Sequence, residues 1–451
     1  MIANNRPSAL VMGLGKSGYS CARYLHRLGY AVEVTDTRAQ PPMLNRLKAE
    51  HSDISFVPGS VALDHMYAFD LVVTSPGLSI HEGVIADFIN EGGRVVGDIE
   101  IFANHAKAPI IAITGANGKS TVTDLVGYLL STSLDVLVGG NIGTPALDLL
   151  EKDVPDVYVL ELSSFQLETT YNLDARAAVV LNISEDHMDR YRDIEDYARS
   201  KQRIYSGTGV MVLNRDDAHV MAMRRPERVT RLFTVGVPES EMEYGIAMHN
   251  GEEWLMNGER PLVPVSEIRL AGRHNQANVL AALALIEDFN LPYETIRKGI
   301  ASYAGLPHRC QIVAEFNGVQ WINDSKATNV GATTAALKGI DRPVILIAGG
   351  EGKDADFSPL AEAVHQGTKK VILIGRDAKI IEQAIGRAVE VEHASDMADA
   401  IERAAAVSTP GDAVLLSPAC ASFDMFDNFE HRGSVFTQLV QARAERQEER
   451  L

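Results

Sequence analysis

Short apolar runs alternate with amphipathic stretches along most of the chain, and this alternation limits the fold more than any other feature. Residues 8–13, 31–36 and 71–77 are rich in β-branched and apolar side chains, as strands are, whereas residues 17–28 read as a helix. Parallel strands need a crossover of about a dozen residues, which a helix usually supplies. The pattern therefore predicts an α/β fold with parallel, doubly wound sheets.

The alternation falls into three blocks, and a chain of 451 residues is long enough to fold them as separate domains. We expect a Rossmann-like sheet over residues 1–97, a central sheet over residues 98–304 and a second Rossmann-like sheet over residues 305–451. The central block changes character at residues 243–265, where the pairs Asn250-Gly251 and Asn257-Gly258 predict a small antiparallel β element, and a third pair, Asn317-Gly318, predicts a hairpin in the last block. Asn and Gly tolerate the positive φ angles that tight hairpin turns require.

The composition limits the kinds of partner. Hydrophobic residues make up 46% of the chain and charged residues 23%, a balance typical of soluble globular proteins. No apolar run approaches the ~20 residues that span a bilayer, and no secretory signal is recognisable, so we expect no membrane insertion and a cytoplasmic location. Three widely spaced cysteines predict neither disulfides nor a zinc site, which fits a reducing cytosol. We also expect a monomer.

The net charge of −18 argues against nucleic-acid binding, because a nucleic-acid-binding protein needs a basic surface. Small anionic ligands remain compatible with this charge. A few lysines and the N–H groups of glycine-rich turns can create a local positive field inside an acidic envelope.

The sharpest local motif is IAITGANGKST at residues 111–121, an apolar strand that runs through a glycine-rich turn into a helix. Such a turn points backbone N–H groups at phosphate oxygens, and the helix N-terminus adds partial positive charge. Lys119 would reach the terminal phosphates and Ser120 would bind Mg²⁺. The central domain is therefore expected to be a P-loop ATPase-type sheet. The usual pattern has a glycine where this chain has Ile113, so the loop is a variant. The alternative is an ordinary strand-to-helix turn.

A second glycine motif, GLGKSG at residues 13–18, follows the first strand, and Asp36 ends the second. This arrangement is typical of dinucleotide-binding folds, which makes an NAD-dependent oxidoreductase an alternative. The same geometry can hold another diphosphate, including that of UDP. The turn at residues 74–77, TSPG, lies at the carboxyl edge of the same sheet, where ligands of such folds bind. A further alternative is a non-catalytic ATP-binding switch.

Three side chains of the central block are candidates for a site beside the phosphate loop. Glu161 ends an apolar strand, which suits a carboxylate that holds Mg²⁺. His187 lies just beyond the next strand and shares that sheet edge, which favours a metal or substrate role over a purely structural one. Lys201, judged by its local sequence alone, looks like an ordinary helix lysine.

Ten phrases, taken together, resemble the Mur ligase family and follow its order over nearly the whole chain. They are TGANGKST, GGNIGTPAL, LELSSFQLET, LNISEDHMDRY, SKQRIY, GRHNQAN, GLPHR, WINDSKATN, GGEGKDADF and SPACASFDMF. WINDSKATN and SPACASFDMF look most like the member that adds D-glutamate. The resemblance implies an ATP-dependent amide ligase that joins D-glutamate to UDP-N-acetylmuramoyl-L-alanine through an acyl phosphate, in peptidoglycan precursor synthesis. It also implies ATP and two Mg²⁺ ions as cofactors.

The resemblance implies a role for each matching position. The ATP-binding positions are Gly115, Asn117, Gly118, Lys119, Ser120, Thr121, Asn278, Arg309, Asp324 and Lys326. The positions for the UDP-linked substrate are Ser17, Asp36, Thr37, Arg38, Ser75, Gly77 and Asn141. The D-glutamate positions are Thr328, Lys353, Ser422, Phe423 and Phe429.

The same resemblance implies metal ligands and catalytic groups. The metal positions are Ser120, Glu161, His187 and Lys201. Lys201 would serve there as a carbamate, a modification that turns a cation into a carboxylate-like ligand. Lys119, His187 and Lys201 would be the catalytic residues. Lys16 stands where the family has an apolar residue, which affects the expected uracil pocket.

Overall fold

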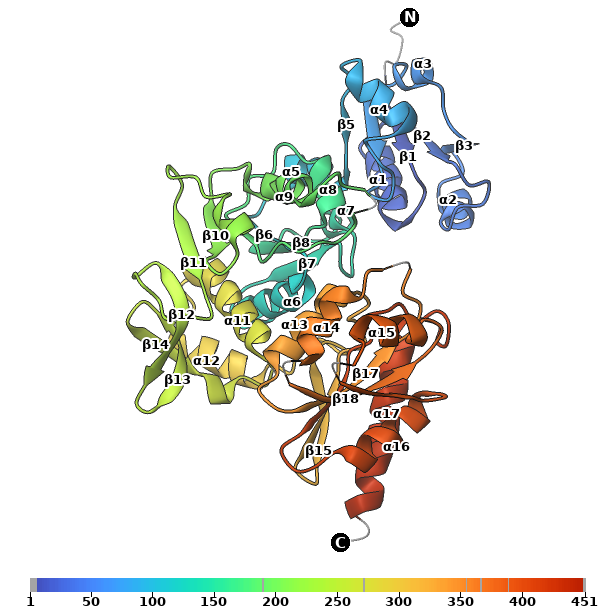
Figure 1. Ribbon diagram of the computed structural model, residues 1–451. Helices are drawn as coiled ribbons and strands as arrows, with labels where there is room; N and C mark the ends of the chain where they lie inside the picture. The colour runs from blue at the N-terminus through green and yellow to red at the C-terminus, as the bar shows by residue number, and fades with distance from the viewer. Residues whose placement is uncertain are drawn as a thin grey trace, which may run out of the picture. The chain divides into compact units, whose positions relative to one another are not determined.

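The computed structural model of the protein describes residues 6–188, 190–270, 272–353, 355–365, 367–387 and 389–448. Its fold is three-domain α/β with largely parallel sheets, as predicted (Figure 1). Two compact units divide the chain: Met1–Phe233 with Ala281–Leu291, and Thr234–Leu280 with Pro292–Leu451. The first unit contains two sheets, and the exact domain limits at residues 97 and 304 stay a prediction.

The N-terminal sheet is parallel throughout, in the order β3-β2-β1-β4-β5. Its strands are β1 (Ser8–Met12), β2 (Ala31–Asp36), β3 (Ser55–Pro58), β4 (Leu71–Thr74) and β5 (Val95–Val96). Its helices are α1 (Lys16–Arg27), α2 (Leu44–Glu50), α3 (Leu63–Met66) and α4 (Gly83–Asn90). The chain leaves β1 toward β2 on one side and later returns to β4 on the other. The carboxyl ends of β1 and β4 therefore form a switch point, the usual place for a ligand in such sheets.

The second sheet contributes six parallel strands to the first unit, in the order β7-β8-β6-β9-β10-β11. The strands are β6 (Ile110–Thr114), β7 (Val136–Gly140), β8 (Val157–Glu161), β9 (Ala177–Val180), β10 (Val210–Asn214) and β11 (Thr230–Phe233). The helices are α5 (Asp98–His105), α6 (Lys119–Ser131), α7 (Ala146–Leu149), α8 (Ser164–Glu168), α9 (Ile194–Gln202), η1 (Arg203–Tyr205) and α10 (Ala218–Met221). Strand β6 lies between β8 and β9, so the loop after it is flanked by both neighbouring strand ends.

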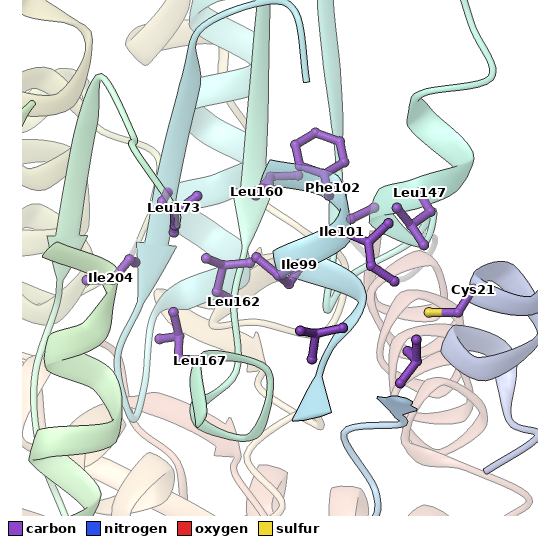
Figure 2. Close-up of a cluster of buried hydrophobic side chains, with 14 of the residues drawn as sticks. Cys21, Ile99, Ile101, Phe102, Leu147, Leu160, Leu162, Leu167, Leu173 and Ile204 are labelled. Carbon is purple, nitrogen blue, oxygen red and sulfur yellow. The ribbon is translucent and has the colours of Figure 1, made fainter. Parts of the chain in front are cut away.

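One apolar cluster joins the two sheets of the first unit. Figure 2 shows Ile99, Ile101 and Phe102 of α5 among side chains of the central sheet and its helices, with Cys21 of α1 at the edge of the cluster. These side chains are at most 4% exposed, and each contributes roughly 1.5–3 kcal/mol when buried. The N-terminal sheet and the sheet that carries the phosphate loop therefore share a core.

The second unit contains an antiparallel β element and a sheet in the order β15-β16-β20-β17-β18-β19. The β element consists of β12 (Glu243–His249), β13 (Glu252–Asn257) and β14 (Arg260–Pro264). The sheet strands are β15 (Gln311–Phe316), β16 (Val319–Asn323), β17 (Val344–Gly349), β18 (Thr368–Ile374), β19 (Glu390–His393) and β20 (Ala413–Leu416). Strand β15 is antiparallel to β16, and the other pairs are parallel.

The remaining helices follow these strands along the chain. They are η2 (Val265–Glu267), α11 (Arg273–Ile286), η3 (Glu287–Phe289), α12 (Tyr293–Ser302), α13 (Val330–Gly339), α14 (Ser358–His365), α15 (Ala378–Ile385), α16 (Met397–Val407) and α17 (Phe429–Glu448). Helix α11 contributes residues to both compact units. In the described residues, no helix combines the length and the apolar character needed to cross a membrane.

Two hairpins have the predicted Asn-Gly turns. Asn250 and Gly251 have φ angles of 51° and 88° between the paired residues His249 and Glu252, as a two-residue primed turn requires. Asn317 and Gly318 form the matching turn between β15 and β16, with φ angles of 53° and 70°.

The third Asn-Gly pair is shifted by one residue from the predicted turn. Asn257 stays in β13 and pairs with Arg260, so the loop is Gly258-Glu259. Gly258 has the positive φ of 55°, and the Asn257 side chain donates a hydrogen bond to the Tyr244 hydroxyl over 3.3 Å.

Candidate functional site

The phosphate loop connects β6 to α6, and glycine conformations shape it. Gly115 has a φ of 156° and Gly118 one of 83°, and a Cβ on Gly115 would lie 2.9 Å from the Leu181 Cβ. Asn182, two residues after β9, holds the loop: its Oδ1 accepts from the Asn117 N–H over 2.8 Å, and its Nδ2 donates back to the Asn117 carbonyl over 3.1 Å. The loop is therefore held in place at the N-terminus of a 13-residue helix, as an anion site requires.

Lys119 and Lys201 meet at the same carbonyl oxygen of this loop. The Lys119 Nζ donates to the carbonyls of Gly115 and Ala116, each over 2.8 Å. The Lys201 Nζ, which reaches the loop from α9, donates to the Gly115 carbonyl over 3.0 Å and to the Thr114 Oγ1 over 3.3 Å. Two lysine side-chain nitrogens therefore converge on the phosphate loop.

Lys201 is 1% exposed, so its local interpretation as an ordinary helix lysine was wrong. Burial, and then the charge of Lys119, hold the pKa of Lys201 well below its usual range. Its Nζ also lies 4.6 Å from the centroid of the Tyr197 ring. The local sequence could not reveal this burial, because the shielding groups come from distant strands.

Glu161 ends β8 directly beside the phosphate loop, because Glu161 pairs with Ile113 in the sheet. Its side chain is buried, and its Oε1 accepts a hydrogen bond from the Asn141 Nδ2 over 2.8 Å. Within the described residues, the other oxygen, Oε2, is buried and accepts no hydrogen bond. A buried carboxylate oxygen without a donor suits a cation. Asn141, predicted near the substrate, is thus placed against a predicted metal ligand.

His187 lies on the loop after β9 in the left-handed region, with a φ of 57°. Its ring centroid is 4.7 Å from that of Phe165, and its Nε2 is 3.7 Å from the Asp186 Oδ2. About half of the side chain is exposed, so it is free to reach a ligand. Across the described parts of the chain, no three His, Cys, Asp or Glu side chains form a metal cluster.

The glycine-rich loop of the N-terminal sheet is closely packed. A Cβ on Gly18 would lie 1.8 Å from the Gly13 carbonyl oxygen, and Gly13 itself has a φ of 91°. Asp36 accepts from the Leu14 N–H over 2.8 Å and takes both the Nε and the Nη2 of Arg38, over 2.8 and 2.7 Å. Mainly because Arg38 donates to it, the pKa of Asp36 falls to about 2.

The other positions predicted for the UDP part lie around this loop. Ser17 is in the first turn of α1 and half-buried, Thr37 follows β2 and is exposed, and Ser75 and Gly77 form the turn after β4. The turn and the glycine loop are close, since a Cβ on Gly13 would be 2.8 Å from the Ser75 Cβ. Lys16 is exposed at the start of α1.

Asp324, directly after β16, is buried and hydrogen-bonded. Its Oδ2 accepts from the Ser417 hydroxyl over 2.8 Å, and its Oδ1 accepts from the Cys310 N–H over 3.2 Å. Burial raises the pKa of Asp324 to about 6, and the charge of Arg309 opposes that rise. Asn278, also buried, donates to the Asn275 Oδ1 over 3.0 Å.

A buried arginine that was not predicted holds two of the predicted segments together. Arg432 is 1% exposed and donates to the carbonyls of Ser325 and Cys420, over 2.8 and 3.1 Å. Ser325 also donates to the Phe429 carbonyl over 2.8 Å. The DSKATN and SPACASF phrases are thus joined through one guanidinium group. The one sequence signal for Arg432 was its position in FEHRG at the start of α17, three residues after the predicted site residue Phe429.

The positions predicted for D-glutamate lie at the carboxyl end of the same sheet. The Lys326 Nζ is 3.7 Å from the Phe429 ring centroid, and the Lys353 Nζ is 5.7 Å from the Phe423 ring centroid. Phe423 is 64% exposed, an unusual state for a phenylalanine, whereas Ser422 is buried. Lys353 has a φ of 52°, and Thr328 is exposed. The lysine side chains of this group can provide a site for an acidic ligand.

A glycine-rich loop with a lysine connects a parallel strand to a helix, and a buried lysine and a carboxylate lie beside it. This arrangement defines an α/β protein of the phosphate-loop nucleotide-binding class. Residues 7–97 match the Mur ligase MurD-like N-terminal domain, residues 113–286 match the Mur ligase middle domain, and residues 308–420 match the Mur ligase glutamate ligase domain. The chain belongs to the Mur ligase family.

Two relatives are similar over nearly their full length. The UDP-N-acetylmuramoylalanine–D-glutamate ligase of Nitrosococcus oceani is 49% identical over 436 residues, which cover 96% of each chain. The ligase of the same name from Pseudomonas aeruginosa is 46% identical over 437 residues, 96% of this chain and 97% of that one.

Solved structures share the fold at low identity. The UDP-N-acetylmuramate-alanine ligase MurC of Thermotoga maritima has a TM-score of 0.55 at 18% identity, over 97% of this chain and all of that one (100%). MurF from Acinetobacter baumannii has a TM-score of 0.55 at 17% identity, over 75% of this chain and 78% of that one. The predicted fold class is confirmed.

Proposed function

We propose that the chain is an ATP-dependent ligase that adds D-glutamate to UDP-N-acetylmuramoyl-L-alanine in peptidoglycan precursor synthesis, as a cytoplasmic monomer. The two relatives named above carry that activity in their names. The observation that carries the chemistry is the convergence of Lys119 and Lys201 on the Gly115 carbonyl, beside the unpaired oxygen of Glu161. An oxidoreductase would leave this constellation without a use.

The reaction needs activation because an ionised carboxylate is a poor acceptor for an amine. A carboxylate oxygen of the UDP-linked substrate attacks the γ-phosphorus of ATP, the bond to ADP breaks, and an acyl phosphate forms. The amine of D-glutamate, as the neutral base, then attacks the acyl carbon. The carbon–oxygen bond breaks, phosphate leaves, and the nitrogen loses a proton. The protein contributes positioning and neutralisation of charge.

Lys119, at the start of α6, would bind the terminal phosphates, with the N–H groups of Gly115 and Gly118 beside them. Ser120 and Thr121 follow Lys119 in the first turn of α6, and both are buried. Positive charge here offsets the repulsion between the triphosphate and the incoming carboxylate, which is strong in a site of low dielectric constant.

Mg²⁺ fits the oxygen donors present at this site. Glu161 and Ser120 would hold one ion, and His187 with a carbamate on Lys201 would hold a second. Mg²⁺, when bound, neutralises phosphate charge and orients the transferred group. The carbamate forms when the neutral Lys201 amine adds to CO₂ and loses a proton, and the lowered pKa of Lys201 favours that neutral amine.

The remaining groups would bind the ends of the substrates. Asn278, Arg309, Asp324 and Lys326 would hold the nucleoside and phosphates of ATP. Lys353 supplies a cation for a D-glutamate carboxylate, and Thr328, Ser422, Phe423 and Phe429 would line the same pocket. The glycine loop of the N-terminal sheet, with Asp36, Thr37 and Arg38, would bind the uridine diphosphate. His187 is a candidate to accept the amine proton.

A phosphate-release assay with a panel of amino acids tests the assignment. With ATP, Mg²⁺ and UDP-N-acetylmuramoyl-L-alanine held fixed, D-glutamate should release phosphate, and L-glutamate and D-alanine should not. Phosphate release without any amino acid would instead support an ATP-binding switch. Equal release with another amino acid would overturn the D-glutamate assignment while leaving the ligase class intact.

A further inference from the structure

Arg190 belongs to the LNISEDHMDRY phrase and has no role in the reaction described above. Its side chain is only 9% exposed, yet it carries a full positive charge. Its Nη1 donates to the Pro76 carbonyl over 2.9 Å, and its Nη2 donates to the Leu78 carbonyl over 3.0 Å. The Nη2 also meets the Glu168 Oε2 at 2.5 Å, and Glu168 is itself 4% exposed. A buried ion pair therefore holds the backbone of a turn in the N-terminal sheet.

That turn, residues 75–78, is the one that presents Ser75 and Gly77. The Ser75 N–H donates to the Met12 carbonyl over 2.8 Å, and the Leu78 N–H closes the turn on the Ser75 carbonyl over 3.0 Å. The turn lies so close to Gly13 that a Cβ on Gly13 would be 2.8 Å from the Ser75 Cβ, so residue 13 has no room for a side chain. A shift of the turn would therefore change the space at the switch point between β1 and β4.

On its other side, Arg190 is tied to the loop of His187. The Arg190 N–H donates to the His187 carbonyl over 2.9 Å. Its guanidinium carbon lies 4.1 Å from the centroid of the Phe165 ring, the ring that His187 also contacts. One residue thus contacts both the turn at the UDP side and the loop at the phosphate side.

We propose that Arg190 is a positioning residue that holds the turn of residues 75–78 in register with the His187 loop, so that the UDP part and the reacting carboxylate are presented together. This inference rests on the proposed function, because it takes the turn as part of the UDP site. The planar guanidinium donates in several fixed directions at once, whereas a lysine ammonium at the end of a flexible stem cannot hold two carbonyls and a carboxylate in one geometry.

Arg190→Lys, which keeps the charge beside Glu168, tests the proposal, and Arg192→Lys is its matched control. Arg192 lies two residues further on, is 79% exposed and pairs with Asp196. In Arg190→Lys, the KM for UDP-N-acetylmuramoyl-L-alanine should rise about tenfold, the factor that corresponds to one charge-assisted hydrogen bond. The KM for ATP should change less than about twofold. Arg192→Lys should leave both values unchanged.

Hydrogen exchange provides a readout that does not depend on turnover. The backbone amides of Ser75 and of residues 77–80 should exchange faster in Arg190→Lys than in Arg192→Lys, because the carbonyls of the turn lose their anchor. Unchanged KM and unchanged exchange in Arg190→Lys would overturn the inference. If the wild-type protein released no phosphate in response to the UDP-linked substrate, the proposed function would be overturned instead. The exchange experiment would still test whether Arg190 anchors the turn.

A second variant covers the case in which Arg190→Lys does not fold. The double substitution Arg190→Gln with Glu168→Gln removes both buried charges, so neither is left unpaired. It should keep the melting temperature close to that of wild type, raise the KM for the UDP-linked substrate and leave the KM for ATP within about twofold. Equal increases in both KM values would mean a general structural role and would overturn the positioning role.

Discussion

At the scale of single residues, burial decides which side chains acquire unusual chemistry. Lys201 and Arg432 look unremarkable in the sequence, because a cation in a helix is most often solvated. Each is 1% exposed in the structure and donates to backbone carbonyls of a loop. The family resemblance pointed to Lys201, whereas nothing in the local sequence pointed to Arg432. The burial of such residues cannot be predicted from the local sequence, because the segments that cover them are distant along the chain.

The carbamate proposal leads to a rescue experiment at Lys201. Lys201→Ala should abolish phosphate release, and a small carboxylate such as formate or acetate should restore part of it by entering the cavity left by the side chain. Lys119→Ala, assayed with the same salts, is the control and should stay inactive, since an anion cannot replace an ammonium group. Absence of rescue at Lys201 would remove the support for a carbamate and leave the ligase assignment untouched.

Asp324 predicts a pH-dependent difference in stability. Its folded pKa of about 6 exceeds the ordinary value near 4, so the folded state holds this proton more tightly than the unfolded chain does. Its contribution is therefore fully present below pH ~4 and is lost as the pH rises through ~6. Asp324→Asn does not titrate, so its stability relative to wild type should increase by up to roughly 3 kcal/mol between pH 4 and pH 7.5.

Urea unfolding of both proteins at the two pH values measures this difference, in which the titration of all other groups largely cancels. If the stability of Asp324→Asn relative to wild type stayed constant or fell as the pH rose, the assignment of a raised pKa to Asp324 would be contradicted.

At the scale of elements, the sequence predicted most strands but not those that depend on their neighbours. Strands β7, β11 and β19 were missed. Strand β7 ends in two glycines and is mostly half-buried, β11 is four residues long with an arginine inside it, and β19 is four residues long at one end of its sheet. The hydrophobic pattern of all three is weak, and pairing with β8, β10 and β18 forms them. The hairpin turns were predictable because Asn-Gly encodes positive φ locally.

The glycine-rich loop after β1 offers a matched pair of substitutions. Gly18→Ala would place a Cβ 1.8 Å from the Gly13 carbonyl oxygen, so the backbone must move, whereas Gly15→Ala meets no atom within 4 Å. We expect Gly18→Ala to lower stability by about 1–3 kcal/mol or more and to weaken binding of the UDP-linked substrate. Gly15→Ala should cost well under about 1 kcal/mol. Thermal unfolding and calorimetric titration measure both effects, and equal losses would contradict the packing argument.

At the scale of the whole molecule, the order of the βα blocks made the fold class predictable, because parallel sheets follow from alternation alone. The site was predictable only where a short sequence motif determines its own backbone conformation, as TGANGKST does. Asn182, which clamps the phosphate loop, and Arg190, which holds the turn after β4, act through contacts between segments distant in the chain. Such contacts leave no periodic trace in one sequence.

Nucleotide binding should be visible in the stability of the whole chain. A non-hydrolysable ATP analogue with Mg²⁺, at about 100 times its dissociation constant, should stabilise the folded protein by roughly 2.7 kcal/mol and raise its melting temperature. Lys119→Ala should lose most of that shift while melting near the wild-type temperature without ligand. A full shift in Lys119→Ala would place the nucleotide elsewhere.

The apolar cluster around α5 also has a consequence for how the enzyme can be taken apart. Cys21 of α1 and Ile99 of α5 belong to one hydrophobic core. Cutting the chain near residue 97 would therefore expose apolar side chains on the fragment that carries the phosphate loop. That fragment should aggregate unless a detergent or the N-terminal fragment covers the exposed surface. Heating should accordingly unfold the two sheets of the first unit in a single cooperative step.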